Sequence, residues 1–171
     1  LLTGIINDTL GFRTSNVTSE TLRIVADLID QGADLPESYY KSLIVRSFEA
    51  VRYWGVGLEK LERDDRLAWT KLSLEDRRRV SYPGKDDADL INILASIEDI
   101  DISVIFIEQN DQHVKVSWRA RPGWDVSDLA CQFGGGGHPA ASGALIKGTL
   151  EETVLAVLKA TKQKLTMSKS G

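Results

Sequence analysis

Residues 133–143 read FGGGGHPAASG, the most unusual local composition in the chain. Each glycine costs roughly 0.5–1 kcal/mol of chain entropy relative to alanine, so four in a row need a physical reason. Either the backbone approaches another group closely, or successive N–H groups converge on an anion. A flexible linker is disfavoured because Phe133 precedes the run and no serine or threonine interrupts it. The spacing also differs from that of a dinucleotide-binding loop. The pattern therefore predicts a loop that holds a phosphate-bearing ligand.

The residues before the glycines predict a β-hairpin and then a short helix. Ser103–Gln109 is rich in β-branched residues, Asn110-Asp111 favours a turn, and His113–Arg119 alternates between apolar and polar residues. The alternation places Val114, Val116 and Trp118 on one face and His113, Lys115, Ser117 and Arg119 on the other. A helix follows from Asp125, with Val126, Leu129, Ala130 and Phe133 inside. Residues 112–124 contain three basic residues and no acid, so we expect the glycine run to lie beside a basic strand face.

The remaining patterns predict an α+β fold with a mixed sheet flanked by helices. A polar stretch at Arg63–Arg66 predicts a domain boundary or hinge, which divides residues 1–62 from residues 63–171. We expect strands at Leu1–Ile6, Leu67–Leu72 and Gly143–Lys147. We expect a first helix from Thr18 or Ser19 to Gly32, with Leu22, Val25 and Ile29 inside. A second should begin at Pro36 and run through Tyr40, Leu43, Ile44 and Phe48 to Val51. Further helices are expected after Ser73 with an Asp76 capping box, over Ala88–Ile97, and from Thr149 with a Glu152 capping box to about Gln163, followed by a frayed tail at Thr166–Gly171.

Composition excludes several classes of protein. The net charge is −4, so a protein that coats duplex DNA by bulk charge is disfavoured. One cysteine, Cys131, rules out an internal disulfide framework, and the short apolar runs predict no membrane contact. Without a secretory pattern, a cytoplasmic location is the expectation. The chain opens at Leu1 in a predicted buried strand, which indicates a fragment of a longer protein.

The glycine segment resembles the signature of the DHH-family phosphoesterases, in their DHH-associated C-terminal domain. Val116-Ser117-Trp118-Arg119 and Asp125-Val126-Ser127 extend this resemblance upstream. Residues 3–9, TGIINDT, resemble the last metal-site motif of the family's N-terminal DHH domain. The order of these motifs is most similar to the branch of oligoribonucleases and 3′-phosphoadenosine-5′-phosphate (pAp) phosphatases.

The resemblance implies a division of roles along the chain. Residues 1–62 would be the helical end of a DHH catalytic domain with a connector, and residues 63–171 a DHH-associated substrate-binding domain. Asp8 would be a manganese ligand. The substrate-binding residues would be Ser117, Arg119, Gly134, Gly135, Gly136, Gly137 and His138. The parent enzyme would hydrolyse a short RNA or DNA oligonucleotide or a small nucleotide such as pAp or a cyclic dinucleotide across a cleft, which the stretch at Arg63–Arg66 would let open and close.

This sequence departs from the family pattern at the metal site. The Asp-His-His motif is not in the chain, whose only histidines are His113 and His138. One carboxylate cannot assemble the two-metal site that the family uses. No complete catalytic set is therefore present, and we expect the chain alone to be inactive, with an N-terminal DHH lobe as its partner. The sequence leaves a homo-oligomer open.

Each candidate residue also has a structural interpretation. Asp8 could cap a turn, Ser117 and Arg119 could lie on a solvated strand face, and His138 could stabilise its loop. We expect His113 on the hairpin surface and Cys131 buried as a small apolar residue. We expect Arg77, Arg78 and Arg79 on a solvated helix face, and Trp54, Trp69, Trp118 and Trp124 in the core or at its rim.

Two other functions remain open at the sequence level. The first is a nucleotide- or single-strand-binding module without catalysis. The second is the editing-associated domain of an alanyl-tRNA synthetase, which has a related glycine motif. The motif around Asp8 and the lack of a long coiled helix disfavour the second.

Overall fold

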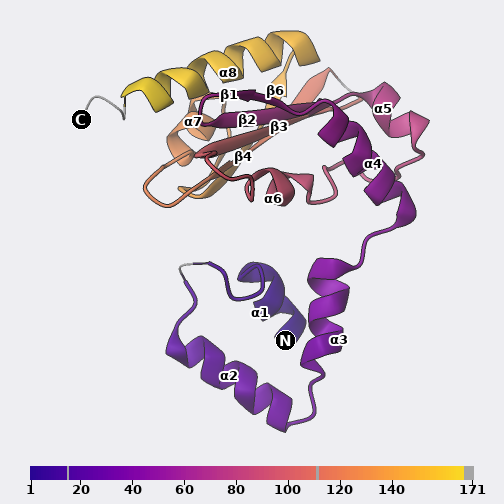
Figure 1. Cartoon of the computed structure of the whole chain (residues 1–171), viewed down its shortest axis with the longest axis vertical. Coiled ribbons are helices and arrows are strands. Elements are labelled where there is room, and N and C mark those ends of the chain that lie inside the picture. The colour runs from indigo at the N-terminus through magenta and orange to yellow at the C-terminus, as the bar shows by residue number, and fades with distance from the viewer. Residues whose placement is uncertain (15, 111, 168–171) are drawn as a thin grey trace. The chain divides into compact units, whose positions relative to one another are not determined.

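The computed structural model describes residues 1–14, 16–110 and 112–167. The described chain divides into two compact units, Leu1–Ser47 and the part that begins at Phe48. Figure 1 labels the elements of both. Among the described residues, no helix combines the length and the apolar character needed to cross a membrane.

The first unit is helical. It contains α1 (Leu2–Asp8), α2 (Ser19–Asp30), α3 (Leu35–Tyr39) and the π-helix η1 (Tyr40–Ile44). Its small core is formed by Leu2, Ile6 and Val25. The strand predicted at Leu1–Ile6 is wrong, because this run forms α1. Leu2 and Ile6 are buried four residues apart on one helix face, a spacing that a short apolar run does not distinguish from a buried strand.

The second helix, α2, begins and ends where the sequence predicts. Thr18 is the N-cap, and its hydroxyl accepts a hydrogen bond from the backbone N–H of Thr21. The predicted inner face is wrong in part, because Val25 is buried whereas Leu22 and Ile29 are exposed. The core of this unit is narrow, so only the centre of the apolar stripe is covered.

The helix predicted from Pro36 to Val51 is interrupted. After η1 the backbone becomes extended at Val45, and α4 (Phe48–Glu59) starts a new helix. The two compact units divide here, earlier than the expected boundary after residue 62. The first strand, β1 (Glu62–Asp64), and its turn to the next strand contain the expected hinge at Arg63–Arg66, so this stretch lies inside the second unit.

The second unit is built on one mixed six-stranded sheet, which confirms the predicted α+β class. Its strand order is β1-β2-β3-β4-β6-β5. Strands β2 and β3 are parallel, and the other neighbours are antiparallel. The further strands are β2 (Leu67–Leu72), β3 (Ile102–Glu108), β4 (His113–Ala120), β5 (Gly136–His138) and β6 (Ala141–Lys147). The hairpin of β3 and β4 was predicted and is confirmed, although Asp111 of its turn lies outside the described residues.

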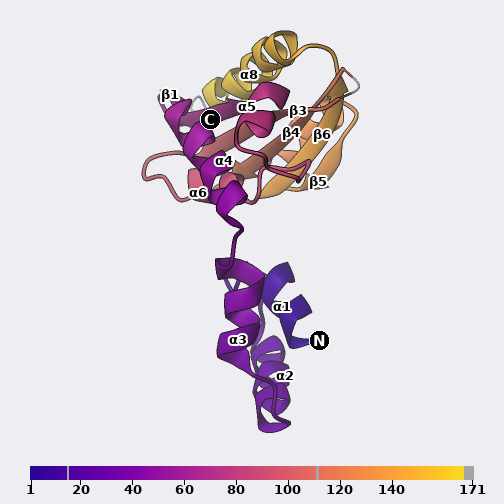
Figure 2. The ribbon, with the colours of Figure 1, turned by 90° about the vertical axis from the view of Figure 1, so that its right-hand side faces the viewer.

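Helices cover the two faces of this sheet separately. On one face, α7 (Ser127–Gln132) and α8 (Leu150–Met167) pack on a core that includes Phe106, Val116 and Trp118. On the other face, α4 and α6 (Leu90–Leu94) pack over Ile105 and Ile107. Figure 1 shows α8 and α6 on opposite faces. Strands β4, β6 and β5 form one side of the sheet (Figure 2).

Capping chemistry sets the starts of two helices as predicted. Ser73 and Asp76 form a capping box at α5 (Leu74–Arg79). Thr149 and Glu152 exchange the same hydrogen bonds at α8. That helix continues to Met167, beyond the predicted end, and residues 168–171 of the expected frayed tail lie outside the described residues.

Three further sequence predictions need correction. The helix predicted over Ala88–Ile97 is reduced to α6, because Asp89 has a left-handed backbone with φ of 67°. Cys131 is exposed, not buried. Arg77 is buried, and its Nη2 donates to the carbonyl of Glu108 at 2.6 Å, whereas Arg78 and Arg79 are exposed as expected.

Candidate functional site

Strand β4 presents the predicted polar residues on the face opposite the core of α7 and α8. Val114, Val116 and Trp118 are fully buried on that core side. Ser117 and Arg119 alternate with them and so point to the other face. Helix α6 covers Ile105 and Ile107 on this second face. The neighbouring part of the face, over β4, β6 and β5, carries the candidate residues; we call it the open face.

The strand register gathers most of the predicted site residues into two rows. Arg119 pairs with Ala141 of β6, and Ala141 pairs with His138 of β5. In the next row Ser117 pairs with Gly143, and Gly143 pairs with Gly136. Residues paired across an antiparallel ladder project to the same face, about 4.5–5.5 Å apart. The site residues from β4 and from the glycine run therefore share the open face.

Close backbone approach explains two of the four glycines. A Cβ atom on Gly135 would collide with the carbonyl oxygen of Gly143. A Cβ on Gly137 would lie 2.6 Å from the carbonyl oxygen of Ala141, and the φ of 144° at Gly137 disfavours any other residue. The run thus includes the edge strand β5, which the sequence did not predict. Its glycines allow the chain to turn from α7 directly onto β6.

The amides of the run do not form the continuous anion cradle that the sequence predicts. Gly134 N–H donates to the carbonyl of Cys131 at 3.1 Å, and Gly135 N–H donates to that of Ala130 at 2.8 Å. These two donors are already used by α7.

The alternation of hydrogen bonds along the antiparallel strands shows which glycine N–H is used neither by α7 nor by β6. Ala120 N–H donates to the carbonyl of Ala140, so Arg119 and Ala141 are a non-hydrogen-bonded pair. Ala141 therefore turns its own N–H and C=O toward His138 of β5. The alternation then turns the N–H of Gly137 away from β6, toward the open edge of the sheet. One glycine amide, not four, faces outward.

Arg119 is a half-buried cation with spare hydrogen-bonding capacity. Its Nη1 donates to the carbonyl of Trp118 at 3.0 Å. Its Nε is buried and has no hydrogen-bond partner among the described residues. Burial lowers the pKa of Arg119, and the nearby carboxylates of Asp87 and Asp89 act in the opposite direction. A buried donor without a partner is costly, and Arg77 Nε and Tyr53 Oη are in the same state within the described part of the chain.

His138 is exposed at the end of β5. Its backbone carbonyl accepts a hydrogen bond from Ser142 Oγ at 2.7 Å, and this bond stabilises the tight turn to β6. The side chain lies in the row of Arg119 and is accessible to a ligand.

The structure adds carboxylates that the sequence analysis missed. The loop before α6 brings Asp86 within electrostatic range of Lys115, and Asp87 and Asp89 within range of Arg119. Residues 112–124 contain no acid, yet the face that they form is not free of acid. Local sequence patterns carry no signal for this arrangement, because the loop lies beside β4 only through the packing of α6 on β3.

The predicted metal ligand lies in the other unit. Asp8 is exposed at the C-terminal end of α1. Within the described ranges, no group of three or more His, Cys, Asp or Glu side chains could hold a metal ion. Divalent metals in proteins need several ligands, so Asp8 by itself does not fit a manganese site.

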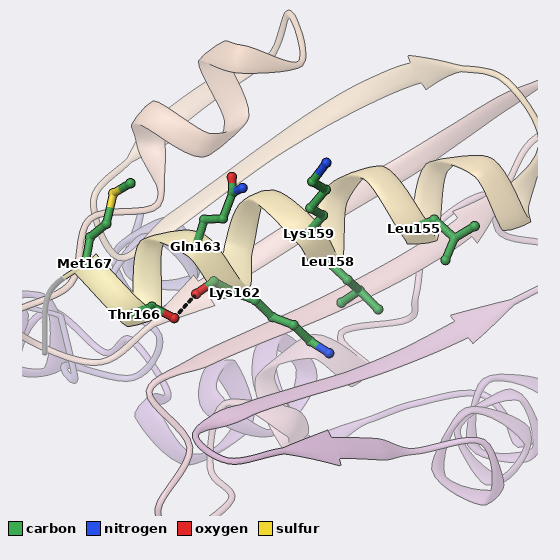
Figure 3. A pocket seen from close by; sticks show the side chains of 7 residues that line it. All are labelled: Leu155, Leu158, Lys159, Lys162, Gln163, Thr166 and Met167. Carbon is green, nitrogen blue, oxygen red and sulfur yellow. Dashed lines mark hydrogen bonds between the residues drawn. The ribbon is translucent and has the colours of Figure 1, made fainter.

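Other singled-out residues have structural positions. Trp69 and Trp118 are buried, Trp54 and Trp124 are partly buried, and His113 is half-buried on β4. A groove of about 680 Å³ lies along α8, between Leu155 and Met167 (Figure 3). No predicted site residue lines this groove.

Comparisons with known proteins match the part of the chain that contains these residues. Residues 79–167 match the DHHA1 domain, and this range contains the site residues of β4 and of the glycine run. The bifunctional oligoribonuclease and PAP phosphatase NrnA of Thermus thermophilus is 32% identical over 97% of this chain and 50% of its own length. The protein of the same name from Bacillus subtilis is 28% identical over 84% of this chain and 45% of its own length.

A solved structure extends the likeness to the fold. An exopolyphosphatase-related protein from Bacteroides fragilis superposes with a TM-score of 0.83 at 28% identity, over 97% of this chain and 48% of that one. The chain thus spans about half the length of the curated relatives described above. Since the matched range includes the glycine segment, β4 and α8, this chain belongs to the DHHA1 domain family and carries the C-terminal domain of DHH-family proteins.

Proposed function

We propose that the open face binds the phosphate of a short oligonucleotide or a small nucleotide, as part of a phosphoesterase that hydrolyses it. The observation that carries the proposal is the buried Nε of Arg119, which has no partner among the described residues. The relatives named for oligoribonuclease and PAP phosphatase activity support the substrate class.

Each residue of the face has a distinct role in this proposal. The Arg119 guanidinium forms paired hydrogen bonds with a phosphate, for which its planar shape is suited. Ser117 donates a hydroxyl, Gly137 donates its outward N–H, and His138 donates from the other end of the row. Gly136 and Gly143 have no side chains, so a ligand can lie directly on the backbone between these donors.

In the proposed enzyme a divalent metal, which the family resemblance gives as manganese, would activate water. The described residues do not assemble that site. Asp8 would supply one ligand, and a DHH lobe outside this chain, which spans 50% of the Thermus thermophilus relative, would supply the others. The residues of this chain then bind and orient the substrate, and the chain alone does not turn it over.

Calorimetric titration of the 171-residue chain with adenosine 3′,5′-bisphosphate tests the binding role. We expect Arg119→Ala to weaken binding about tenfold or more, since a charge-assisted pair of hydrogen bonds contributes about 1.5–3 kcal/mol. Arg79→Ala, at an exposed position of α5, is the control and should leave affinity unchanged. Equal affinities for Arg119→Ala and the unsubstituted chain would refute the proposal.

A second experiment tests the division of labour. The same ligand is incubated with the chain and Mn²⁺, and released phosphate is measured. We expect no turnover above the protein-free control. Substantial turnover by the chain alone would show that it holds a complete catalytic site and would overturn the proposed dependence on a second lobe.

A further inference from the structure

The loop before α6 carries charged groups on the open face that the proposed phosphate site does not use. We call residues 85–89, with the sequence KDDAD, the acidic loop. Several hydrogen bonds hold the loop in place, including the following three. Trp54 Nε1 donates to the carbonyl of Ala88 at 2.8 Å, Gln109 Nε2 donates to that of Lys85 at 3.2 Å, and the N–H of Ile91 donates to Asp87 at 2.8 Å.

Packing places the acidic loop next to the cations of β4. Leu90 and Ile91, which follow the loop, pack with Ile105 and Ile107 of β3. Those two strand positions pair with Ser117 and Lys115. The loop therefore runs beside the polar side chains of β4, and α6 contacts that strand as well as β3.

The two cations of β4, Lys115 and Arg119, each lie near carboxylates of the loop. Asp86 lies within electrostatic range of Lys115, and Asp87 and Asp89 within range of Arg119. Asp87 is only 8% exposed, so solvent screens its charge poorly. Together with Lys85 of the loop itself, three cations and three carboxylates give this part of the face a formal charge of 0, with His138 neutral.

This balance distinguishes ligands by their charge. A single phosphate gains the hydrogen bonds of Arg119 and meets limited repulsion. A chain of phosphates places further negative charge near Asp87 and Asp89, where each added charge is repelled. A nucleoside instead offers hydroxyl and amino donors, which carboxylates accept, whereas polyphosphate at neutral pH offers few.

We propose that the acidic loop limits the negative charge accepted beside Arg119, so that the open face selects a nucleotide with one phosphate there over inorganic polyphosphate. The inference rests on the proposed function, because it assumes that Arg119 binds phosphate. The loop is also backbone-strained at Ala88 and Asp89, with φ of 51° and 67°. Such strain in residues other than glycine is retained where the surrounding structure holds it in place.

Asp89→Asn is the decisive variant. Asparagine tolerates the left-handed backbone, keeps the shape of the side chain and removes one charge at an exposed position. Asp65→Asn is the matched control, because Asp65 is also exposed, has φ of 51° and lies at the turn from β1 to β2, away from β4 in the sheet order. Adenosine 5′-monophosphate and inorganic tripolyphosphate are the two probes, titrated calorimetrically at low ionic strength.

We expect Asp89→Asn to raise the affinity for tripolyphosphate about threefold or more, and that for the monophosphate by a smaller factor, with the difference shrinking at 0.5 M salt. The double variant Asp87→Asn/Asp89→Asn should shift the ratio of tripolyphosphate affinity to monophosphate affinity further. Circular dichroism verifies that each variant folds, and Asp89→Asn carries the test if the buried Asp87 substitution does not.

Arg119→Ala separates this inference from the function on which it rests. If Arg119→Ala leaves monophosphate binding unchanged, or the unsubstituted chain does not bind monophosphate, the proposed function fails. If Arg119→Ala weakens binding while Asp89→Asn leaves the ratio of the two affinities equal to that of Asp65→Asn, only the role of the acidic loop is overturned.

Discussion

Arg119 and His138 lie in one row of the sheet, two strands apart, with Ala141 between them. Neighbouring strands are about 4.8 Å apart, so the two backbones are separated by roughly 10 Å. That span accommodates a phosphate with its attached sugar. Because the two residues are on different strands, their alignment depends on the register of the hairpin between β5 and β6. The glycines that permit this register are therefore the first targets for mutation.

Gly135→Ala should destabilise the second unit. The new methyl group would collide with the backbone of Gly143 and Ala144, which cannot move without breaking the ladder with β4. Overpacking of this kind costs about 1–3 kcal/mol. Thermal unfolding measures the effect, and Gly136→Ala is the control because nothing lies within 4 Å of its Cβ position. Equal melting temperatures for the two variants would contradict the steric explanation.

Gly136→Ala should have the opposite profile, with normal stability and weakened ligand binding. Its methyl group would project onto the open face in the row of Ser117 and Gly143, where the ligand is proposed to lie. We expect affinity for adenosine 3′,5′-bisphosphate to fall about threefold to tenfold, as for other small steric losses in a binding site. Gly4→Ala, on the exposed surface of α1, should leave this affinity unchanged. An unaltered affinity in Gly136→Ala would place the ligand elsewhere.

The alternation of β4 and two capping boxes were predictable from sequence because each depends on residues near one another in the chain. The α+β class followed from the same local patterns. The helix α1 was mistaken for a strand because a run of six residues fits both periods. The strand β5 was missed because glycine has little strand propensity, and its pairing with β6 depends on close backbone approach.

The sequence predicted the phosphate-binding candidates of the site but not the carboxylates beside them. Ser117, Arg119 and the glycine run are adjacent to one another in sequence or pair through neighbouring strands. The acidic loop lies 30 to 34 residues before Arg119 in the chain and reaches it only because α6 packs on β3.

Asp76→Asn should reduce stability at neutral pH but not in acid. Burial raises the pKa of Asp76, but hydrogen bonds from Lys60 and Ser73 outweigh it and hold the pKa below its ordinary value of 3.8. Lys60 Nζ lies 2.6 Å from the Asp76 carboxylate, and Ser73 N–H lies 2.8 Å from it. A lowered folded-state pKa contributes stability above the unfolded value, and this stability is lost as pH falls through the folded value.

Chemical denaturation at several pH values measures this contribution. We expect Asp76→Asn to cost about 1 kcal/mol at pH 7, and we expect this cost to shrink as the pH falls below the ordinary Asp pKa of 3.8. Glu75→Gln, at an exposed neighbouring position on α5, should show no such convergence. A cost that is constant from pH 7 to pH 3 would assign the effect to lost packing, not to the charge of Asp76.

Arg119→Lys distinguishes the shape of the guanidinium from its charge. Lysine keeps the positive charge beside Asp87 and Asp89, so the electrostatic environment of the fold is preserved. It lacks the Nε donor and the planar fork that present two parallel hydrogen bonds to one phosphate. We therefore expect binding of adenosine 3′,5′-bisphosphate to weaken nearly as much as in Arg119→Ala, with a melting temperature close to that of the unsubstituted chain. If lysine restores most of the affinity, Arg119 acts only as a point charge, and its buried Nε needs an explanation other than ligand binding.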